Sequence, residues 1–399
     1  MRAALLSPLR SPLRGPLDES PLTLVQKAIG ILRKYGTNAH VYLPGIGVVS
    51  GITAGNYLDS TGTTAATVDN PVGLALDALQ AMTLGAELVT NGDFSAGTTG
   101  WTLSSGAAVS ANALSLPSAS AQANQTSMSV LANSTYKITF DVSGAGAGLF
   151  LDMSIGGTFI GGAVIGASNG PKSFIVPTIN ANTLVFLNDP GSTGACTIDN
   201  ISVKQVPGIH ASQSTTASKP ILRSSGGRYS WEFDGSNDYL SLGAPLFQMS
   251  DDHCVGVAFK CATAANYNGV FEQRNTASGT PLAPALEYNN GTLYAFYRDD
   301  ASASLTLSAS IAVSETAVAS VRKSSSNYTL NKNGVQAGLL TGAFGTTTIN
   351  SAAFGASGFG PGNFFAGNTN AAYAIKATVP DADRLTLDRW LGSLAGVSF

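Results

Sequence analysis

The sequence predicts a mainly β protein with two β-sandwich domains, preceded by a short N-terminal arm and a helix. Short runs in which apolar and polar residues alternate recur along most of the chain, and 45 Gly and 17 Pro mark turns between them. Only 11% of the 399 residues are charged, so Ser, Thr, Ala and Gly supply much of the surface. The length indicates more than one domain.

The charge balance argues against two classes of partner. With 21 basic and 24 acidic residues the net charge is −3, so the chain lacks the positive field that attracts nucleic-acid phosphates. It has no apolar run of about 18 residues that could insert into a membrane. The early apolar run Ala3–Leu6 is too short for a signal peptide. We therefore expect synthesis in a cytoplasm, without export by the general route.

The three cysteines are Cys196, Cys254 and Cys261. The last two lie in one predicted strand and are separated by about 24 Å if that strand is extended, so they cannot pair with each other. No histidine lies at the close spacing that a zinc site requires. The sequence therefore predicts buried free thiols.

Residues 1–40 are predicted to form an arm followed by a helix. "SPLR" occurs twice over residues 7–14 and "GPLD" follows at 15–18, and Pro at this density favours an extended, polyproline-like backbone. This arm is either a docking segment or a disordered tail. In the following "TLVQKAIGILRKYG", Thr23 and Gln26 have the spacing of a capping box.

The predicted helix is amphipathic. Its apolar stripe consists of Leu24, Val25, Ala28, Ile29 and Leu32. Gly36 marks its C-terminal end. A partner, or another copy of the chain, could cover the stripe. Residues 41–86 then read as a linker with short strands, because Gly, Asn and Pro interrupt its apolar segments.

Residues 87–206 are predicted to form the first sandwich. In "TYKITFDVSG" the residues Tyr136, Ile138 and Phe140 alternate with polar neighbours, and similar runs follow at the regular spacing of a sandwich of about 120 residues. The opening "NGDFSAGTTGW", the middle "TYKITFDV" and the closing "IDNISVKQV" resemble CenC-like carbohydrate-binding modules. The resemblance implies a jelly roll.

Residues 207–399 are predicted to form the second sandwich, closed by a helix. "LEYNNGTLYAFYR" and "NYTLNKNGVQAG" each place Asn-Gly between two strands, which is the strongest short signal for a hairpin. Near the C-terminus Leu387, Trp390, Leu391 and Leu394 follow the spacing of one helix face.

The segment "YSWEFDGSNDYLSLG", residues 229–243, raises the question of catalysis. Glu232 and Asp234 are two apart on a strand and share a face, so a carboxylate pair is possible. The pattern resembles the Glu-x-Asp-x-x-Glu motif of concanavalin-type glucanases, but Asn237 occupies the last position and cannot act as a carboxylate. "FDGSNDYLSL" more closely resembles the first strand and turn of laminin G-like, concanavalin A-like domains, which implies a turn role for these residues.

The order of "DSTGTTAATVDNPVGLALDA", "HASQSTTASKPILR" and "YSWEFDGSNDYLSLG" resembles the leader and first strand of laminin G-like domains of bacteriophage tail proteins, with the carbohydrate-module-like unit inserted inside that leader. This resemblance implies a non-catalytic tail fibre, spike or related receptor-binding protein of the virion, which binds host surface polysaccharide. The N-terminal arm would attach to other tail or baseplate proteins, and a homo-oligomer, by resemblance a trimer, is expected. Two alternatives stay open. One is a polysaccharide depolymerase that uses Glu232 and Asp234, and the other is a baseplate or capsid-decoration component with protein contacts only.

Candidate sugar-binding residues are aromatic, because sugars stack on ring faces. Trp101 is one candidate, with core packing as the favoured alternative. The second cluster comprises Tyr288, Tyr294, Phe296, Tyr297 and Arg298, where hairpin packing is the alternative. Alternation predicts that Tyr294 and Phe296 share one face while Tyr297 takes the other.

One metal site is also considered. Asp93 and Asp199 lie near the start and end of the first sandwich, where the resembling modules often hold a structural calcium ion. No other cofactor is expected.

Overall fold

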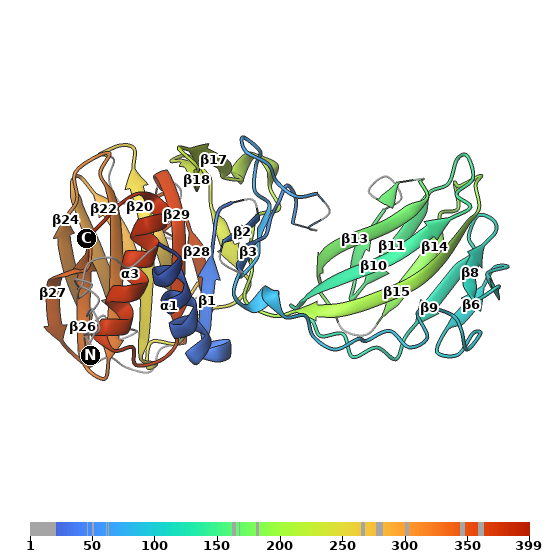
Figure 1. Ribbon diagram of the computed structural model, residues 1–399, viewed down its shortest axis with the longest axis horizontal. Helices are drawn as coiled ribbons and strands as arrows, with labels where there is room; N and C mark the ends of the chain where they lie inside the picture. Colours follow the sequence, from blue (N-terminus) through green and yellow to red (C-terminus); the bar gives the residue numbers. More distant parts are fainter. Residues whose placement is uncertain are drawn as a thin grey trace, which may run out of the picture.

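The structure is a computed structural model. It describes residues 21–399 except 46, 50–51, 61, 63, 162–164, 167, 181–182, 265–267, 277–281, 300–302, 344–347 and 358–362. The predicted arm at residues 7–18 lies outside the described residues. Figure 1 shows two bodies side by side: residues 87–206 form a smaller sandwich, and the segments before and after it form a larger one.

The larger sandwich contains an eight-stranded and a nine-stranded antiparallel sheet. The eight-stranded sheet has the order β17 (Ile221–Ser225), β18 (Arg228–Asp234), β29 (Ala366–Ile375), β20 (His253–Cys261), β25 (Thr316–Ser324), β26 (Asn327–Lys332) and β27 (Val335–Thr341), with β1 (Ala39–Tyr42) also paired to β29. The nine-stranded sheet has the order β24 (Ser304–Ser310), β23 (Thr292–Arg298), β22 (Leu282–Asn289), β21 (Asn268–Arg274), β28 (Ser351–Phe354), β19 (Leu240–Leu242), β16 (Ala211–Ser212), β5 (Leu74–Ala75) and β4 (Asn56–Tyr57).

The smaller sandwich packs two five-stranded antiparallel sheets. One has the order β13 (Gly170–Pro177), β10 (Thr135–Ser143), β15 (Cys196–Val206), β8 (Ala113–Leu116) and β7 (Ala108–Ser110), and the other β12 (Thr158–Ile160), β11 (Leu151–Ile155), β14 (Leu184–Asn188), β9 (Gln122–Gln125) and β6 (Thr102–Ser104). Apart from these sheets, β2 (Gly47–Val49) and β3 (Ile52–Ala54) pair as a two-stranded antiparallel sheet. The mainly β fold with two sandwiches is therefore confirmed.

The larger sandwich has three layers. Its central core lies between the two sheets and includes Trp231, Phe271 and Phe354. The helices α1 (Pro21–Lys34) and α3 (Asp381–Ala395) cover the opposite face of the eight-stranded sheet, where Trp390 packs near Ala258 (Figure 1). Within the described residues, no helix covers the outer face of the nine-stranded sheet.

Local signals placed the hairpins and the C-terminal helix correctly. Both Asn-Gly pairs form tight turns in which both residues have positive φ: 42° and 86° for Asn290 and Gly291, and 47° and 77° for Asn333 and Gly334. Such turns match the twist of the strands that they join. The helix α3 ends at a left-handed Gly396 with φ 81°.

The apolar stripe of α1 is covered by the same chain and not by a partner. Val25, Ala28, Ile29 and Leu32 are buried against α3 and the eight-stranded sheet. Residues 41–86 are likewise more than a linker, because β4 and β5 extend the nine-stranded sheet and β1 joins the other one. Short strands of this kind carry little periodic signal, which is why the sequence does not reveal their sheet.

A cluster of polar groups forms hydrogen bonds between the larger sandwich and the end of the smaller one. The Asp77 carboxylate is hydrogen-bonded to His40 Nδ1 at 2.6 Å and accepts a bond from the backbone amide of Val41 at 3.1 Å. The Asp77 amide donates to His210 Nδ1 at 3.0 Å, and His210 Nε2 lies 3.1 Å from the carbonyl of Val206, the last residue of β15. Burial lowers the pKa of His210, which favours the neutral ring.

The cysteines are free and buried, as expected. Burial raises the pKa of the Cys196 and Cys254 thiols to about 12, which keeps them protonated and unreactive. Among the described residues, no helix is both long and apolar enough to span a membrane.

Candidate functional site

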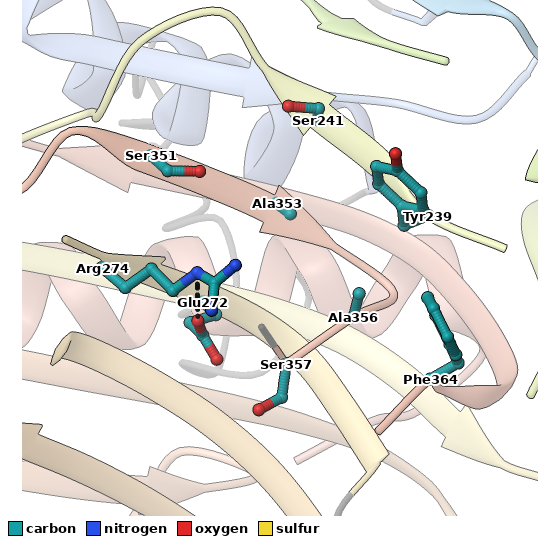
Figure 2. A pocket seen from close by; sticks show the side chains of 9 residues that line it. All are labelled: Tyr239, Ser241, Glu272, Arg274, Ser351, Ala353, Ala356, Ser357 and Phe364. Carbon is teal, nitrogen blue, oxygen red and sulfur yellow. Dashed lines mark ion pairs between the residues drawn. The ribbon is translucent and has the colours of Figure 1, made fainter. Parts of the chain in front are cut away.

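A hollow of about 310 Å³ lies on the outer face of the nine-stranded sheet. Strand pairing creates its floor: Ser241 on β19 lies opposite Ala353 on β28, which lies opposite Glu272 on β21. The three strands are far apart in the sequence but adjacent in the sheet. Figure 2 shows the lining residues, which are Tyr239, Ser241, Glu272, Arg274, Ser351, Ala353, Ala356, Ser357 and Phe364.

An ion pair lies in this hollow. Glu272 and Arg274 are two residues apart on β21 and therefore project from the same face. Arg274 Nε lies 3.3 Å from Glu272 Oε1, and the Glu272 side chain is only 3% exposed (Figure 2). A buried carboxylate of this kind requires a compensating cation, and the guanidinium supplies it. Together the pair presents both hydrogen-bond donors and acceptors to the hollow.

Aromatic rings and hydroxyl groups complete the lining. The rings of Tyr239 and Phe364 have centroids 6.4 Å apart at an angle of 32°, and both side chains are partly exposed. Ser357 donates from its hydroxyl to Glu287 Oε1 at 2.7 Å, and burial raises the pKa of Glu287. Apolar ring faces beside directed donors and acceptors suit a ligand that has both apolar faces and hydroxyl groups.

An aromatic platform lies across β22 from the hollow, on the same face of the sheet. Tyr294 and Phe296 on β23 stack with centroids 5.5 Å apart at 16°, and Arg298 follows two residues later. All three side chains are partly exposed. The predicted sharing of one face by Tyr294 and Phe296 is therefore observed.

Tyr288 and Tyr297 belong to the core instead, which corrects their expected place in the sugar site. Tyr288 is 0% and Tyr297 1% exposed, so neither ring can stack on a ligand. The Tyr297 hydroxyl lies 3.0 Å from His253 Nε2, and its ring packs edge-on against Tyr328 at 4.7 Å. Alternation along β22 and β23 turns both rings inward.

Trp101 also packs in a core, that of the smaller sandwich. Its side chain is 7% exposed, its ring lies 5.3 Å from that of Phe94, and its indole nitrogen donates to the Asn91 carbonyl at 3.2 Å. The only hydrogen-bond donor of the indole is thus used within the protein. The core alternative for Trp101 is the one that the structure supports.

Glu232 and Asp234 have structural partners rather than a shared site. Glu232 Oε2 accepts a hydrogen bond from Arg223 Nε at 2.5 Å. Asp234 Oδ1 accepts from the backbone amides of Ser236 at 2.7 Å and Asn237 at 3.2 Å, which shapes the turn after β18. Both residues lie on the eight-stranded sheet, whereas the hollow lies on the other sheet.

The third carboxylate of the segment supports the same turn. Asp238 is 5% exposed, and its Oδ2 accepts from the Asp234 amide at 3.0 Å. Burial, followed by the nearby Asp234 carboxylate, raises the pKa of Asp238 to about 6. The acidic residues of this segment therefore build a turn, as the laminin G-like resemblance implies.

The two aspartates considered for calcium bond to local groups. Asp93 Oδ1 accepts hydrogen bonds from the Ser95 backbone amide at 3.2 Å and from the Ser95 hydroxyl at 3.0 Å. The hydrogen bond from the amide, followed by that from the hydroxyl, lowers the pKa of Asp93. Asp199 Oδ1 accepts from the Asn200 amide at 2.7 Å. Across the described residues, no group of three or more His, Cys, Asp or Glu side chains is placed to hold a metal ion.

The residues of the hollow are absent from the candidates that the sequence suggests. Tyr239 and Ser241 lie inside the segment 229–243, yet only the acids of that segment match a recognisable motif. The signal that could have revealed the site is "FEQR" at 271–274, where Glu272 and Arg274 interrupt an otherwise buried strand at two-residue spacing. Charges on one face of such a strand indicate a site or an ion pair.

Comparisons with known proteins give remote similarity only. No family model matches the sequence, and no curated protein matches it. Among solved structures, the CBM40 of the Ruminococcus gnavus IT-sialidase bound to α2,3-sialyllactose is 14% identical, with 40% of this chain and 96% of that chain covered and a TM-score of 0.33. The botulinum neurotoxin serotype G binding domain is 10% identical, with 48% and 49% covered and a TM-score of 0.38. At these scores the similarity carries no function over to this chain.

Proposed function

We propose that this chain is a non-catalytic glycan-binding protein whose binding surface is the outer face of the nine-stranded sheet. The observation that carries the proposal is the combination on one face of two aromatic pairs, Tyr239 with Phe364 and Tyr294 with Phe296, on either side of a buried ion pair. Sugars present apolar ring faces and hydroxyl groups, which match these two kinds of surface.

The size of the face suits more than one sugar unit. The hollow spans β19, β28 and β21, and β23 lies two strands beyond β21. At an interstrand spacing of about 4.8 Å, the platform is therefore about 10 Å from the near edge of the hollow and about 19 Å from its far edge. Each contact alone gives modest affinity. Several contacts along one oligosaccharide, or several copies of the protein on one particle, would add to it.

We infer a bacteriophage virion as the setting. The sequence supports this through its resemblance to laminin G-like domains of tail proteins and through the Ser-Pro-Leu-Arg arm, which would attach to tail or baseplate proteins. The ligand would then be host surface polysaccharide, and the protein a tail fibre or spike, assembled as a trimer in the host cytoplasm. A structural virion component with protein contacts only is the alternative that the binding experiment distinguishes.

A depolymerase that uses Glu232 and Asp234 is disfavoured. Glycoside hydrolysis needs two carboxylates that face one substrate bond. Here Glu232 is bonded to Arg223 and Asp234 to the amides of its own turn, as described above. Neither carboxylate lines the hollow. Structural calcium at Asp93 and Asp199 stays a separate proposal, which thermal unfolding with and without a chelator would test.

The test is a glycan array probed with the full-length protein and its variants. We expect Tyr239→Ala and Phe296→Ala each to reduce binding about tenfold, because each removes one ring face of the site. Phe159→Ala is the matched control, because this ring is 62% exposed on the smaller sandwich. In parallel, the release of reducing ends from the glycans is measured for the full-length protein and for its variant Glu232→Gln.

Binding that both site variants weaken and the control does not would support the proposal. Equal binding by all variants would mean that the glycan binds at another part of the protein. Release of reducing ends that Glu232→Gln abolishes would replace the proposal with the depolymerase, and absence of binding to any glycan, with retention in virions, would favour the structural role.

A further inference from the structure

Arg298 differs from four other arginines of the larger sandwich, which pair with carboxylates. Arg223, Arg274, Arg322 and Arg384 each form an ion pair with a carboxylate. With the described residues, the Arg298 side chain forms neither an ion pair nor a hydrogen bond, and its Nε is buried without a partner. A desolvated donor without a partner is costly. The Arg298 side chain as a whole is partly exposed, so a ligand group would reach the guanidinium through its terminal nitrogens.

Among the described residues around Arg298, none compensates its charge. It ends β23, and its register neighbours on β24 are Ser304, with Thr306 and Ser308 farther along, all exposed and uncharged. The next residue, Asp299, points to the other face and is 4% exposed, and it accepts a bond from the Ala303 amide at 2.8 Å.

The other acids that the structure describes on this face are paired or distant. Glu272 pairs with Arg274, as described above. Glu287 lies opposite Tyr294, four residues from Arg298 along β23, which is about 14 Å in a strand. Glu287 is also bonded to Ser357. Neither acid therefore neutralises Arg298.

The spacing links Arg298 to the aromatic platform. Phe296 and Arg298 are two residues apart on one face, a separation of about 7 Å along the strand. A sugar ring stacked on Phe296 would hold a substituent within reach of the guanidinium, and the exposed hydroxyls of β24 would line the other side. The planar guanidinium binds a carboxylate through two parallel hydrogen bonds.

We propose that the glycan bound at this face is acidic and that Arg298 binds the carboxylate of one of its sugar units. The ligand class is therefore a polysaccharide that contains uronic or other carboxylated sugars. This inference rests on the proposed glycan-binding function and adds to it the class of sugar that is bound.

The experiment is affinity electrophoresis of the full-length protein in gels that contain polygalacturonate, alginate or hyaluronan. Each polymer is also used after reduction of its carboxylates to alcohols, which leaves the remaining sugar chemistry unchanged. Dextran sulfate is included to reveal binding that depends on anionic charge alone. The variants are Arg298→Gln, Arg298→Lys and the control Arg228→Gln, since Arg228 is exposed on the other sheet.

We expect at least one carboxylated polymer to retard the protein at least tenfold more strongly than its reduced form. Arg298→Gln should lose that difference, Arg298→Lys should retain part of it, and Arg228→Gln should retain all of it. Binding of native and reduced polymers with equal strength, or full retardation of Arg298→Gln, would overturn the inference but leave glycan binding in place. Preference for dextran sulfate would overturn it as well. If the array also shows no glycan binding, the proposed function fails together with it.

Discussion

Replacing Asp238 with Asn is expected to stabilise the protein at neutral pH but not in acid. Burial, with the nearby Asp234 carboxylate, raises the pKa of Asp238 from 3.8 to about 6. The folded state therefore keeps this proton up to about pH 6, whereas the unfolded state releases it near pH 4, so stability falls as the pH rises through that interval. The rise corresponds to about 3 kcal/mol that the ionised carboxylate costs the folded state at pH 7.

An asparagine would avoid this cost and keep the structural bond. Its amide oxygen can still accept from the Asp234 amide, which Asp238 Oδ2 accepts at 3.0 Å. We expect Asp238→Asn to raise the free energy of unfolding by about 2–3 kcal/mol at pH 7 and by almost nothing at pH 3.5.

The assay is urea unfolding followed by tryptophan fluorescence at both pH values. Asp381→Asn serves as a control of opposite sign, because the hydrogen bond from Arg384 lowers the pKa of Asp381 and its ionised form stabilises the fold. That variant should lose stability at pH 7 and less at pH 3.5, because the stabilisation by the ionised carboxylate fades as the pH falls through its lowered pKa. A loss of stability in Asp238→Asn at pH 7, or an equal gain at both pH values, would refute the reasoning.

Three further outcomes are expected. Burial lowers the pKa of His253 to about 3, so the unfolded state alone takes up a proton below pH 6.5, and unfolding at pH 4.5 should be easier by about 3 kcal/mol from this residue than at pH 7. The variant His253→Phe should show a smaller acid effect in the same urea titrations. A thiol reagent should label none of Cys196, Cys254 and Cys261 in the folded protein and all three after denaturation, as absorbance would show; early labelling would contradict their burial. A Cβ at Gly269 would collide with the Ser357 amide, so Gly269→Ala should lower the melting temperature and weaken glycan binding. Gly243→Ala is its control, since nothing lies within 4 Å of the added atom, and equal effects of the two changes would count against this explanation.

Local features of the sequence predicted what depends on neighbouring residues. The Asn-Gly turns, the alternation that separates Phe296 from Tyr297 and the helix around Trp390 all follow from signals within about ten residues. The same alternation correctly predicted that Tyr294 and Phe296 share a face, because two-residue spacing on a strand is enough to fix it.

The hollow could not be predicted in this way. Its floor joins Ser241, Ala353 and Glu272, which meet only because β28 returns from far along the chain to pair between β19 and β21. Sheet register across such distances is fixed by tertiary packing and leaves no local signal. The same limit applies to α1, whose amphipathic stripe was evident but whose cover, α3, comes from the opposite end of the chain.

The smaller sandwich leaves and rejoins the larger one at adjacent strands, because Ala75 on β5 lies directly opposite Ala211 on β16. The two ends of the insertion thus meet at a distance that a short peptide could bridge. Recombination could exchange or remove the whole inserted domain without breaking either sheet of its host. The inserted domain can therefore vary in evolution while the outer face of the nine-stranded sheet, with its aromatic residues, stays unchanged.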